Sequence, residues 1–231
     1  MDTISLENKI GVFFKNGNIL KEALTHRSYL NENPSWKLPH NERLEFLGDA
    51  VLELVATEYL WRVRPKFEEG LLTLLRAALV NTKMLSKIAE EEIGLQKYLL
   101  VSKGESQMSG RAMETILADA FEALTGAVYV DQGFEAAEKF VSRFVLSRLE
   151  EIEKRQLYKD PKSLLQEISQ ADFKMTPEYR ILSESGPDHA RMFAVGVYFG
   201  NELKGEGSGA SKQEAETDAA KKALEKLEAG K

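Results

Sequence analysis

The spacing of apolar residues changes once along this chain of 231 residues, close to residues 156–160. Before that point apolar residues recur with the period of α-helices. After Pro161 the pattern becomes one helix, three strands and a second helix within about 70 residues, which is enough for a self-contained α+β unit. The sequence therefore predicts an all-α domain over 1–155, a linker over 156–160 and a small α+β domain of order α-β-β-β-α over 161–231.

Capping residues, glycines and prolines set the expected element boundaries. In the first part we expect short helices capped by Ser5 and Asn18, helices over 40–64, 68–81, 82–92, 113–130 and 134–155, and a polar loop over 103–110. In the second part we expect a helix over 163–170, strands over 179–184, 191–199 and 202–207 with a hairpin turn at Gly200-Asn201, and a last helix capped by Ser211.

The residue inventory excludes several kinds of chemistry. The chain has no cysteine and only three histidines, His26, His40 and His189. A thiol nucleophile, a disulfide scaffold and a zinc site with cysteine ligands are therefore excluded. The first residues do not resemble a signal peptide, and no apolar run approaches the ~18 residues that span a bilayer. We expect a cytoplasmic protein with no membrane partner.

The charge balance argues against an extended nucleic-acid surface. The chain carries 31 Lys and Arg against 37 Asp and Glu, a net charge of −6. Both parts are acidic, since residues 160–231 hold 10 basic and 13 acidic side chains. Phosphate binding needs clustered Lys and Arg. Any nucleic-acid site must therefore be a local patch.

Three carboxylates share one face of the helix expected over 40–64. At about 100° per residue, Glu42, Glu45 and Asp49 fall within an arc of roughly 60°. Like charges stacked in this way repel one another unless something compensates them. This block alone is consistent either with a solvated face held by salt bridges or with a binding site.

A second pair of carboxylates lies in an apolar setting. Asp119 and Glu122 are the only polar side chains between Ile116 and Leu124, and their spacing puts them on one face. A helix that is apolar nearly all round is buried, so these acids need partners. Together with Glu45 and Asp49 they form an oxygen donor set that suits a hard divalent cation such as Mg²⁺. A ferritin-like di-iron site is excluded because the chain has no Glu-x-x-His, and a metal-activated water fits better than histidine acid–base chemistry.

Several blocks of this sequence resemble those of the ribonuclease III family, and the resemblance covers nearly the whole chain. Residues 41–49, NERLEFLGD, resemble the signature nonapeptide of that family at every position. Residues 25–29, Glu69-Gly70 with Arg76-Ala77, and residues 116–124 resemble its other blocks in the expected order, and the C-terminal unit resembles its double-stranded-RNA-binding domain.

The resemblance implies a homodimeric endoribonuclease that hydrolyses double-stranded RNA, including structured RNA such as rRNA precursors. It implies Mg²⁺ as cofactor, with Mn²⁺ as a substitute, and products with 5′-phosphate and 3′-hydroxyl ends and short 3′ overhangs. We expect two metal ions per site at turnover, one to lower the pKa of a bound water and one to stabilise the departing 3′ oxygen.

Carried over by position, the resemblance implies roles for seven residues of the first domain. The expected metal ligands are Glu45, Asp49, Asp119 and Glu122, and the catalytic residues on which turnover depends most are Asp49 and Glu122. Glu42 and Glu69 match acidic positions at the cleft or dimer interface, with mere solubility as the alternative. Phe46 flanks the acidic face, and the family seats this aromatic in a socket of the partner subunit. The alternative is a phenylalanine that packs under its own N-terminal helices.

In the C-terminal unit the resemblance implies three groups of RNA-binding residues. Gln166 and Glu167 match the residues that reach one minor groove, and Pro187 and His189 lie in the loop that enters the next. Ser211 and Lys212 begin a helix whose N-terminus meets phosphates across the major groove. Gln213 stands where a second lysine is frequent, and this domain is acidic. A domain that has lost RNA binding is therefore the alternative here.

Two other functions are weighed against the nuclease. A non-cleaving regulator that binds double-stranded RNA has the same fold, but the presence of all four acids disfavours it. A helical phosphohydrolase of the HD type is disfavoured because the chain has no His-Asp dipeptide, and the C-terminal unit would then have no task.

Overall fold

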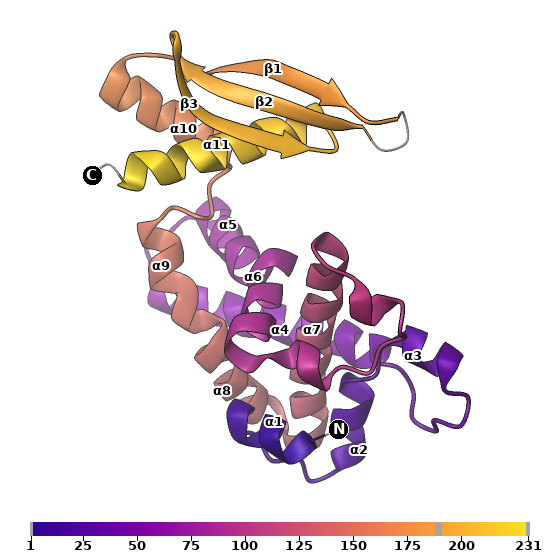
Figure 1. Ribbon diagram of the computed structural model, residues 1–231. Helices are drawn as coiled ribbons and strands as arrows, with labels where there is room; N and C mark the ends of the chain where they lie inside the picture. The colour runs from indigo at the N-terminus through magenta and orange to yellow at the C-terminus, as the bar shows by residue number, and fades with distance from the viewer. Residues whose placement is uncertain (1, 188–190, 230–231) are drawn as a thin grey trace. The chain divides into compact units, whose positions relative to one another are not determined.

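The computed structural model describes residues 2–187 and 191–229. The chain divides into two compact units, Met1–Arg155 and Gln156–Lys231 (Figure 1). The first unit is helical, and the second contains one antiparallel sheet with helices packed on it. The predicted fold class is confirmed. Among the described residues, no helix is long and apolar enough to cross a bilayer.

The first unit is built from helices of very different length. They are α1 (Thr3–Ile10), α2 (Gly17–Ala23), α3 (Arg27–Glu32), α4 (Glu42–Val63), α5 (Glu69–Val80), α6 (Thr82–Lys87), α7 (Arg111–Gln132), α8 (Phe134–Phe144) and α9 (Leu149–Lys154). Short π or 3₁₀ segments cover Ile88–Ile93, Leu95–Tyr98, Glu105–Gln107 and Leu146–Arg148. The loop expected over 103–110 thus contains one short helical turn.

The caps of the first two helices differ from the prediction. Asp2 caps α1, because its carboxylate accepts a hydrogen bond from the N–H of Ser5 at 3.1 Å. Asn16 caps α2 and accepts from the N–H of Asn18 at 3.1 Å. A capping side chain bonds a backbone N–H two or three residues further on. The prediction therefore named the donor of each capping bond in place of the cap.

The prediction of one continuous helix over 134–155 is also wrong, because the helix is interrupted. A 3₁₀ turn at Leu146–Arg148 separates α8 from α9. Leu146, Leu149 and Ile152 are all buried. The turn therefore redirects the chain while its apolar side chains stay in the core.

The two longest helices, α4 and α7, cross at very short range in the centre of this unit. A Cβ atom added at Gly48 of α4 would lie 1.8 Å from the backbone oxygen of Glu122. One added at Gly126 of α7 would lie 2.2 Å from the backbone oxygen of Leu44. Only glycine leaves room for backbones this close. Figure 1 shows both helices running through the middle of the unit.

The second unit is a three-stranded sheet with α10 and α11 on one face (Figure 1). Its elements are α10 (Pro161–Ile168), a π segment (Ser169–Phe173), β1 (Glu178–Ser185), β2 (Met192–Phe199), β3 (Glu202–Gly209) and α11 (Lys212–Ala229). The strands are antiparallel in the order β1-β2-β3. Leu165, Val197, Phe199 and the alanines Ala219 and Ala223 form the core between helices and sheet. The turn at Gly200 has φ +61°, as a tight hairpin requires.

Candidate active site

The close crossing of α4 and α7 places the acidic residues of both helices beside one another. Glu45 and Asp49 stand on either side of Gly48, and Glu122 is the residue whose backbone meets Gly48. Asp119 lies one turn earlier on α7. Two acidic blocks about 70 residues apart in the sequence thus lie side by side, because Gly48 and Gly126 have no side chain to hold the helices apart.

Three of these carboxylates form a compact cluster. One oxygen from each of Glu45, Asp119 and Glu122 lies within 4.8 Å of the other two, and all three residues are half-buried. Among the described residues, no lysine or arginine forms an ion pair with them. Oxygen-only donors at this spacing fit a hard divalent cation, which would supply the missing positive charge.

The pKa values of the three carboxyl groups show that their ionised forms are unfavourable without a positive partner. Burial, with the charges of Asp49, Asp119 and Glu45, raises the pKa of Glu122 from its usual value of 4.5 to about 8. Burial is also the main cause of the raised pKa of Glu45, with Asp119 as the next largest contribution. The pKa of Asp119 is raised by burial as well. A bound cation would favour the ionised form of these carboxyl groups, because its charge offsets the cost of burying them.

Asp49 and Glu42 lie outside the compact cluster. Asp49 is exposed, and its charge is the first of those that raise the pKa of Glu122. Glu42 is exposed and lies 3.5 Å from the Arg27 guanidinium and 3.8 Å from His40 Nδ1. Glu42 therefore has an ion-pair partner of its own in Arg27, whereas Asp49 stands at the open edge of the cluster.

A second network beside the cluster was missed by the sequence reasoning. His26 Nδ1 lies 3.0 Å from the Glu105 carboxylate and 2.9 Å from Ser28 Oγ, which accepts from the N–H of Ser102. His26 acts to lower the pKa of Asp119, against the larger upward effect of burial. These contacts join the start of α3 to the loop after Tyr98. Their members are too far apart in sequence for a local pattern to reveal them.

The other predicted residues of the first unit lie on its surface. Phe46 is 82% exposed, which excludes packing under its own N-terminal helices. Glu69 is exposed in the first turn of α5 and accepts a hydrogen bond from Thr73 Oγ1 at 2.9 Å.

The predicted RNA-binding residues of the second unit are exposed where the structure describes them. Gln166 and Glu167 stand on α10, and Glu167 pairs with Lys159 at 2.5 Å. Ser211 caps α11 as predicted, since its Oγ accepts from the N–H of Glu214 at 3.1 Å. The neighbouring Lys212 ammonium lies 5.8 Å from the centre of the Phe193 ring. Pro187 ends the described part of its loop, and His189 lies outside the described residues.

Family models match both units. The Ribonuclease-III-like model covers residues 16–149, and the Double-stranded RNA binding motif covers residues 161–227. A helical unit with an acidic cluster, joined to this RNA-binding fold, defines a metal-dependent nuclease of double-stranded RNA.

The chain belongs to the ribonuclease III family and is an endoribonuclease specific for double-stranded RNA. It is 45% identical over 226 residues to Ribonuclease 3 of Pelotomaculum thermopropionicum, covering 97% of this chain and 93% of that protein. It is 47% identical over 224 residues to Ribonuclease 3 of Carboxydothermus hydrogenoformans, covering 97% and 95%.

A similar solved structure is the nuclease domain of ribonuclease III from Campylobacter jejuni, described for structural flexibility in the region involved in dimer formation. The identity is 43% and the TM-score 0.56, over 62% of this chain and 95% of that one.

The raised pKa of Glu122 predicts how the stability of the metal-free protein depends on pH. The unfolded chain loses this proton near pH 4.5 and the folded chain near pH 8. The folded state therefore binds more protons between these values, and the free energy of unfolding falls as pH rises through them. In EDTA we expect the melting temperature to fall between about pH 5 and pH 8, and to fall less steeply in Glu122→Gln. Identical slopes in thermal melts of the two proteins would contradict the assignment.

Proposed function

We propose that this enzyme hydrolyses phosphodiester bonds of double-stranded RNA with Mg²⁺ held by Glu45, Asp119 and Glu122 and, directly or through water, by Asp49. The products have 5′-phosphate and 3′-hydroxyl ends with short 3′ overhangs. The observation that supports this proposal is the half-buried cluster of three carboxylates within 4.8 Å of one another. No described lysine or arginine neutralises it.

In this proposal each acidic residue of the cluster has a defined task in holding the metal or a water. Glu45, Asp119 and Glu122 would hold the metal, which would supply Lewis-acid chemistry by lowering the pKa of a bound water and neutralising negative charge on the phosphate. Glu122 must lose its proton to act as a ligand, so metal binding releases a proton at neutral pH. Asp49, at the exposed edge of the cluster, would hold and orient a water there. Asp119 and Glu122 are anchored by the buried helix α7.

Structured transcripts, such as rRNA precursors, are the proposed natural substrates, and Mn²⁺ is the proposed substitute for Mg²⁺. The relatives reported above are bacterial enzymes, and bacterial transcripts lie in the cytoplasm. We therefore place the reaction there.

Cleavage of a perfect RNA duplex by the full chain, with Mg²⁺ and with excess EDTA, tests the proposed function. We expect cleavage with Mg²⁺, none with EDTA, and recovery when Mg²⁺ is restored. The single strand of the same sequence is the control and should stay intact. A duplex that is bound but never cut would contradict the proposal and favour the non-cleaving regulator.

We further propose that a second copy of the chain covers Phe46. A cavity of about 370 Å³ lies at the other end of α4, lined by the apolar side chains of Trp61, Pro65, Phe67 and Leu72 and by Arg62 and Arg64. The 22 residues of α4 span about 33 Å. In a two-fold dimer with antiparallel α4 helices, the Phe46 of each copy would reach the cavity of its partner. Two active sites would then be available for the two strands of one duplex.

Phe46→Ala should weaken this dimer strongly. A buried aromatic anchor is worth about 2 kcal/mol, and a two-fold dimer contains two of them. The dissociation constant should therefore rise about a thousandfold. Sedimentation equilibrium at micromolar protein measures it, and double-strand cleavage should fall in parallel. A variant that stays fully dimeric and cuts both strands would show that Phe46 is not at the interface.

Lys212→Ala should lower affinity for duplexes of any sequence. Lys212 stands at the N-terminus of α11, where backbone N–H groups and the helix dipole also favour phosphate. Phosphate contacts carry no sequence information, and each contributes about 1 to the slope of log affinity against log salt. Filter binding at several salt concentrations should show a slope smaller by about 1. Lys226→Ala, at the opposite end of α11, is the matched control, and equal slopes in both variants would argue against the contact.

A further inference from the structure

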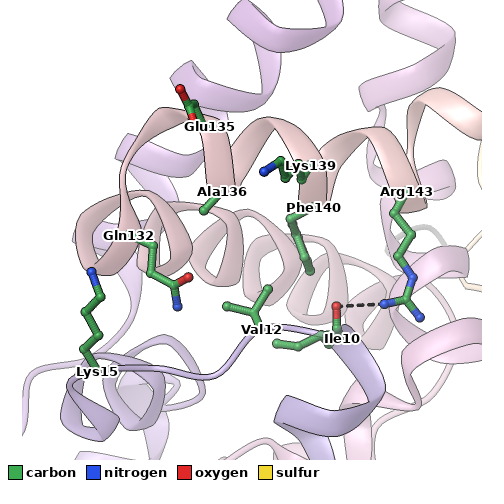
Figure 2. Close-up of a pocket in the computed structure, with 10 residues that line it drawn as sticks. Ile10, Val12, Lys15, Gln132, Glu135, Ala136, Lys139, Phe140 and Arg143 are labelled. Carbon is green, nitrogen blue, oxygen red and sulfur yellow. Dashed lines mark hydrogen bonds between the residues drawn. The ribbon is translucent and has the colours of Figure 1, made fainter.

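A cavity on the first unit has no task in the proposed reaction. It measures about 400 Å³ and lies between the end of α1, the segment after it, the end of α7 and one face of α8. Figure 2 shows Lys139 and Arg143 projecting from α8, and Lys15 from the segment that follows α1. The carboxylate cluster does not contribute to its lining.

Positive charge is concentrated in this cavity although the chain as a whole is acidic. Lys15, Lys139 and Arg143 line it with a single acid, Glu135, whose side chain points away from the cavity (Figure 2). Lys15 lies near the Asp131 carboxylate. Within the described part of the chain, Lys139 and Arg143 have no carboxylate partner, although they stand one turn apart on α8. Like charges at this spacing destabilise a helix, and a bound anion would relieve the repulsion.

Arg143 is held in place before any ligand arrives. Its Nη1 donates to the carbonyl oxygen of Ile10 at 2.9 Å, and its Nη2 donates to that of Lys9 at 3.1 Å. Gly11 leaves the necessary space, since a Cβ there would lie 2.8 Å from Nη1. A guanidinium has five N–H donors, so three remain for an anion.

The rest of the lining suits a ligand with an organic part. Val12, Ala136 and the small exposed part of Phe140 form an apolar wall beside the cations. Gln132 is fixed because its Nε2 donates to the carbonyl oxygen of Phe13 at 2.8 Å. No described residue donates to its Oε1, which is thus free to accept an N–H or O–H. Inorganic phosphate would leave the wall unused.

We infer that this cavity binds a nucleoside phosphate. The phosphates lie against Lys139 and Arg143, where even a single phosphate, with a charge of about −1.5 to −2 at neutral pH, matches the cations better than one carboxylate would. The nucleoside lies on the wall formed by Val12, Ala136 and Phe140 and donates to Gln132. A cavity of about 400 Å³ falls within the size range of small-molecule sites.

Calorimetric titration of the full chain with ADP in EDTA tests the inference. EDTA removes divalent ions, so ADP cannot be recruited through a metal at the carboxylate cluster. We expect saturable binding of one ADP per chain, at least fivefold weaker in Lys139→Ala. Lys83→Ala is the matched control, because Lys83 is an exposed lysine outside the cavity. Inorganic phosphate should bind more weakly than ADP, and adenosine more weakly still.

Three results would overturn the inference. They are an absence of saturable ADP binding, equal affinity in Lys139→Ala and wild type, or phosphate binding as tight as that of ADP. If ADP does not bind and Lys139→Ala instead weakens binding of an RNA duplex, the cations contact the RNA backbone and the nucleotide assignment is wrong. Thermal melting of each variant verifies that it is folded, and the NMR methyl signals of Val12 should move when ADP is added.

Discussion

Glu122→Gln is expected to lower duplex cleavage at least about a thousandfold while leaving duplex binding nearly unchanged. Glutamine keeps the shape of the side chain and removes the charge that a divalent metal requires. Loss of a metal ligand removes several kcal/mol of transition-state stabilisation, and each 1.4 kcal/mol corresponds to about tenfold in rate. Asp49→Asn should have an effect of similar size, since Asp49 stands beside Glu122 at the open edge of the cluster.

Single-turnover cleavage and a gel-shift assay on the same preparation measure both quantities. Glu58→Gln is the control, because Glu58 is an exposed acid on the same helix α4 as Asp49. Its cleavage rate should equal that of wild type. Normal turnover in Glu122→Gln or Asp49→Asn would contradict the metal-site assignment.

Gly48→Ala should separate α4 from α7 and abolish cleavage. The added methyl group would lie 1.8 Å from the backbone oxygen of Glu122, so the two helices must move apart. Overpacking typically costs about 1–3 kcal/mol, and a clash with backbone cannot be relieved by a side-chain rotation. We expect a loss of stability of at least about 3 kcal/mol. The movement would also displace Glu45 from Asp119 and Glu122, so metal affinity should fall even where the variant folds.

Gly17→Ala is the matched control for this prediction. Gly17 is also helical, but nothing lies within 4 Å of a Cβ added there. Alanine has the higher helix propensity, so this variant should be as stable as wild type or more stable. Urea unfolding of both variants in EDTA separates the packing effect from metal binding. Equal stability of Gly48→Ala and wild type would show that the crossing is not as tight as described.

The acidic cluster was accessible to sequence reasoning because a helix fixes the angle between its side chains. The spacing of Glu45 and Asp49, and of Asp119 and Glu122, determines which face each pair occupies. The apolar residues around Asp119 and Glu122 correctly indicated burial. The distance between the two helices could not be predicted in this way. It depends on two glycines that meet only in the folded protein.

Other features depended on contacts between distant segments, or on which of two capping residues two or three positions apart makes the capping hydrogen bond. The His26–Glu105 pair and the cavity between Val12 and Lys139 each join segments that a local pattern cannot connect. The caps of α1 and α2 were misplaced because Asp2 and Ser5, or Asn16 and Asn18, are all acceptable capping residues. Only the hydrogen bonds distinguish them. The strands were predictable because apolar alternation and the hairpin turn at Gly200-Asn201 indicated the same boundaries. The start of α11 was predictable from the capping residue Ser211.

Anomalous diffraction from crystals of the full chain soaked with Mn²⁺ would locate the metal site itself. We expect an anomalous peak within coordination distance of Glu45, Asp119 and Glu122, with Asp49 bound directly or through water. The same soak of Glu122→Gln should give a much weaker peak. A strong Mn²⁺ peak elsewhere, with none at this cluster in the wild-type protein, would contradict the proposed metal site.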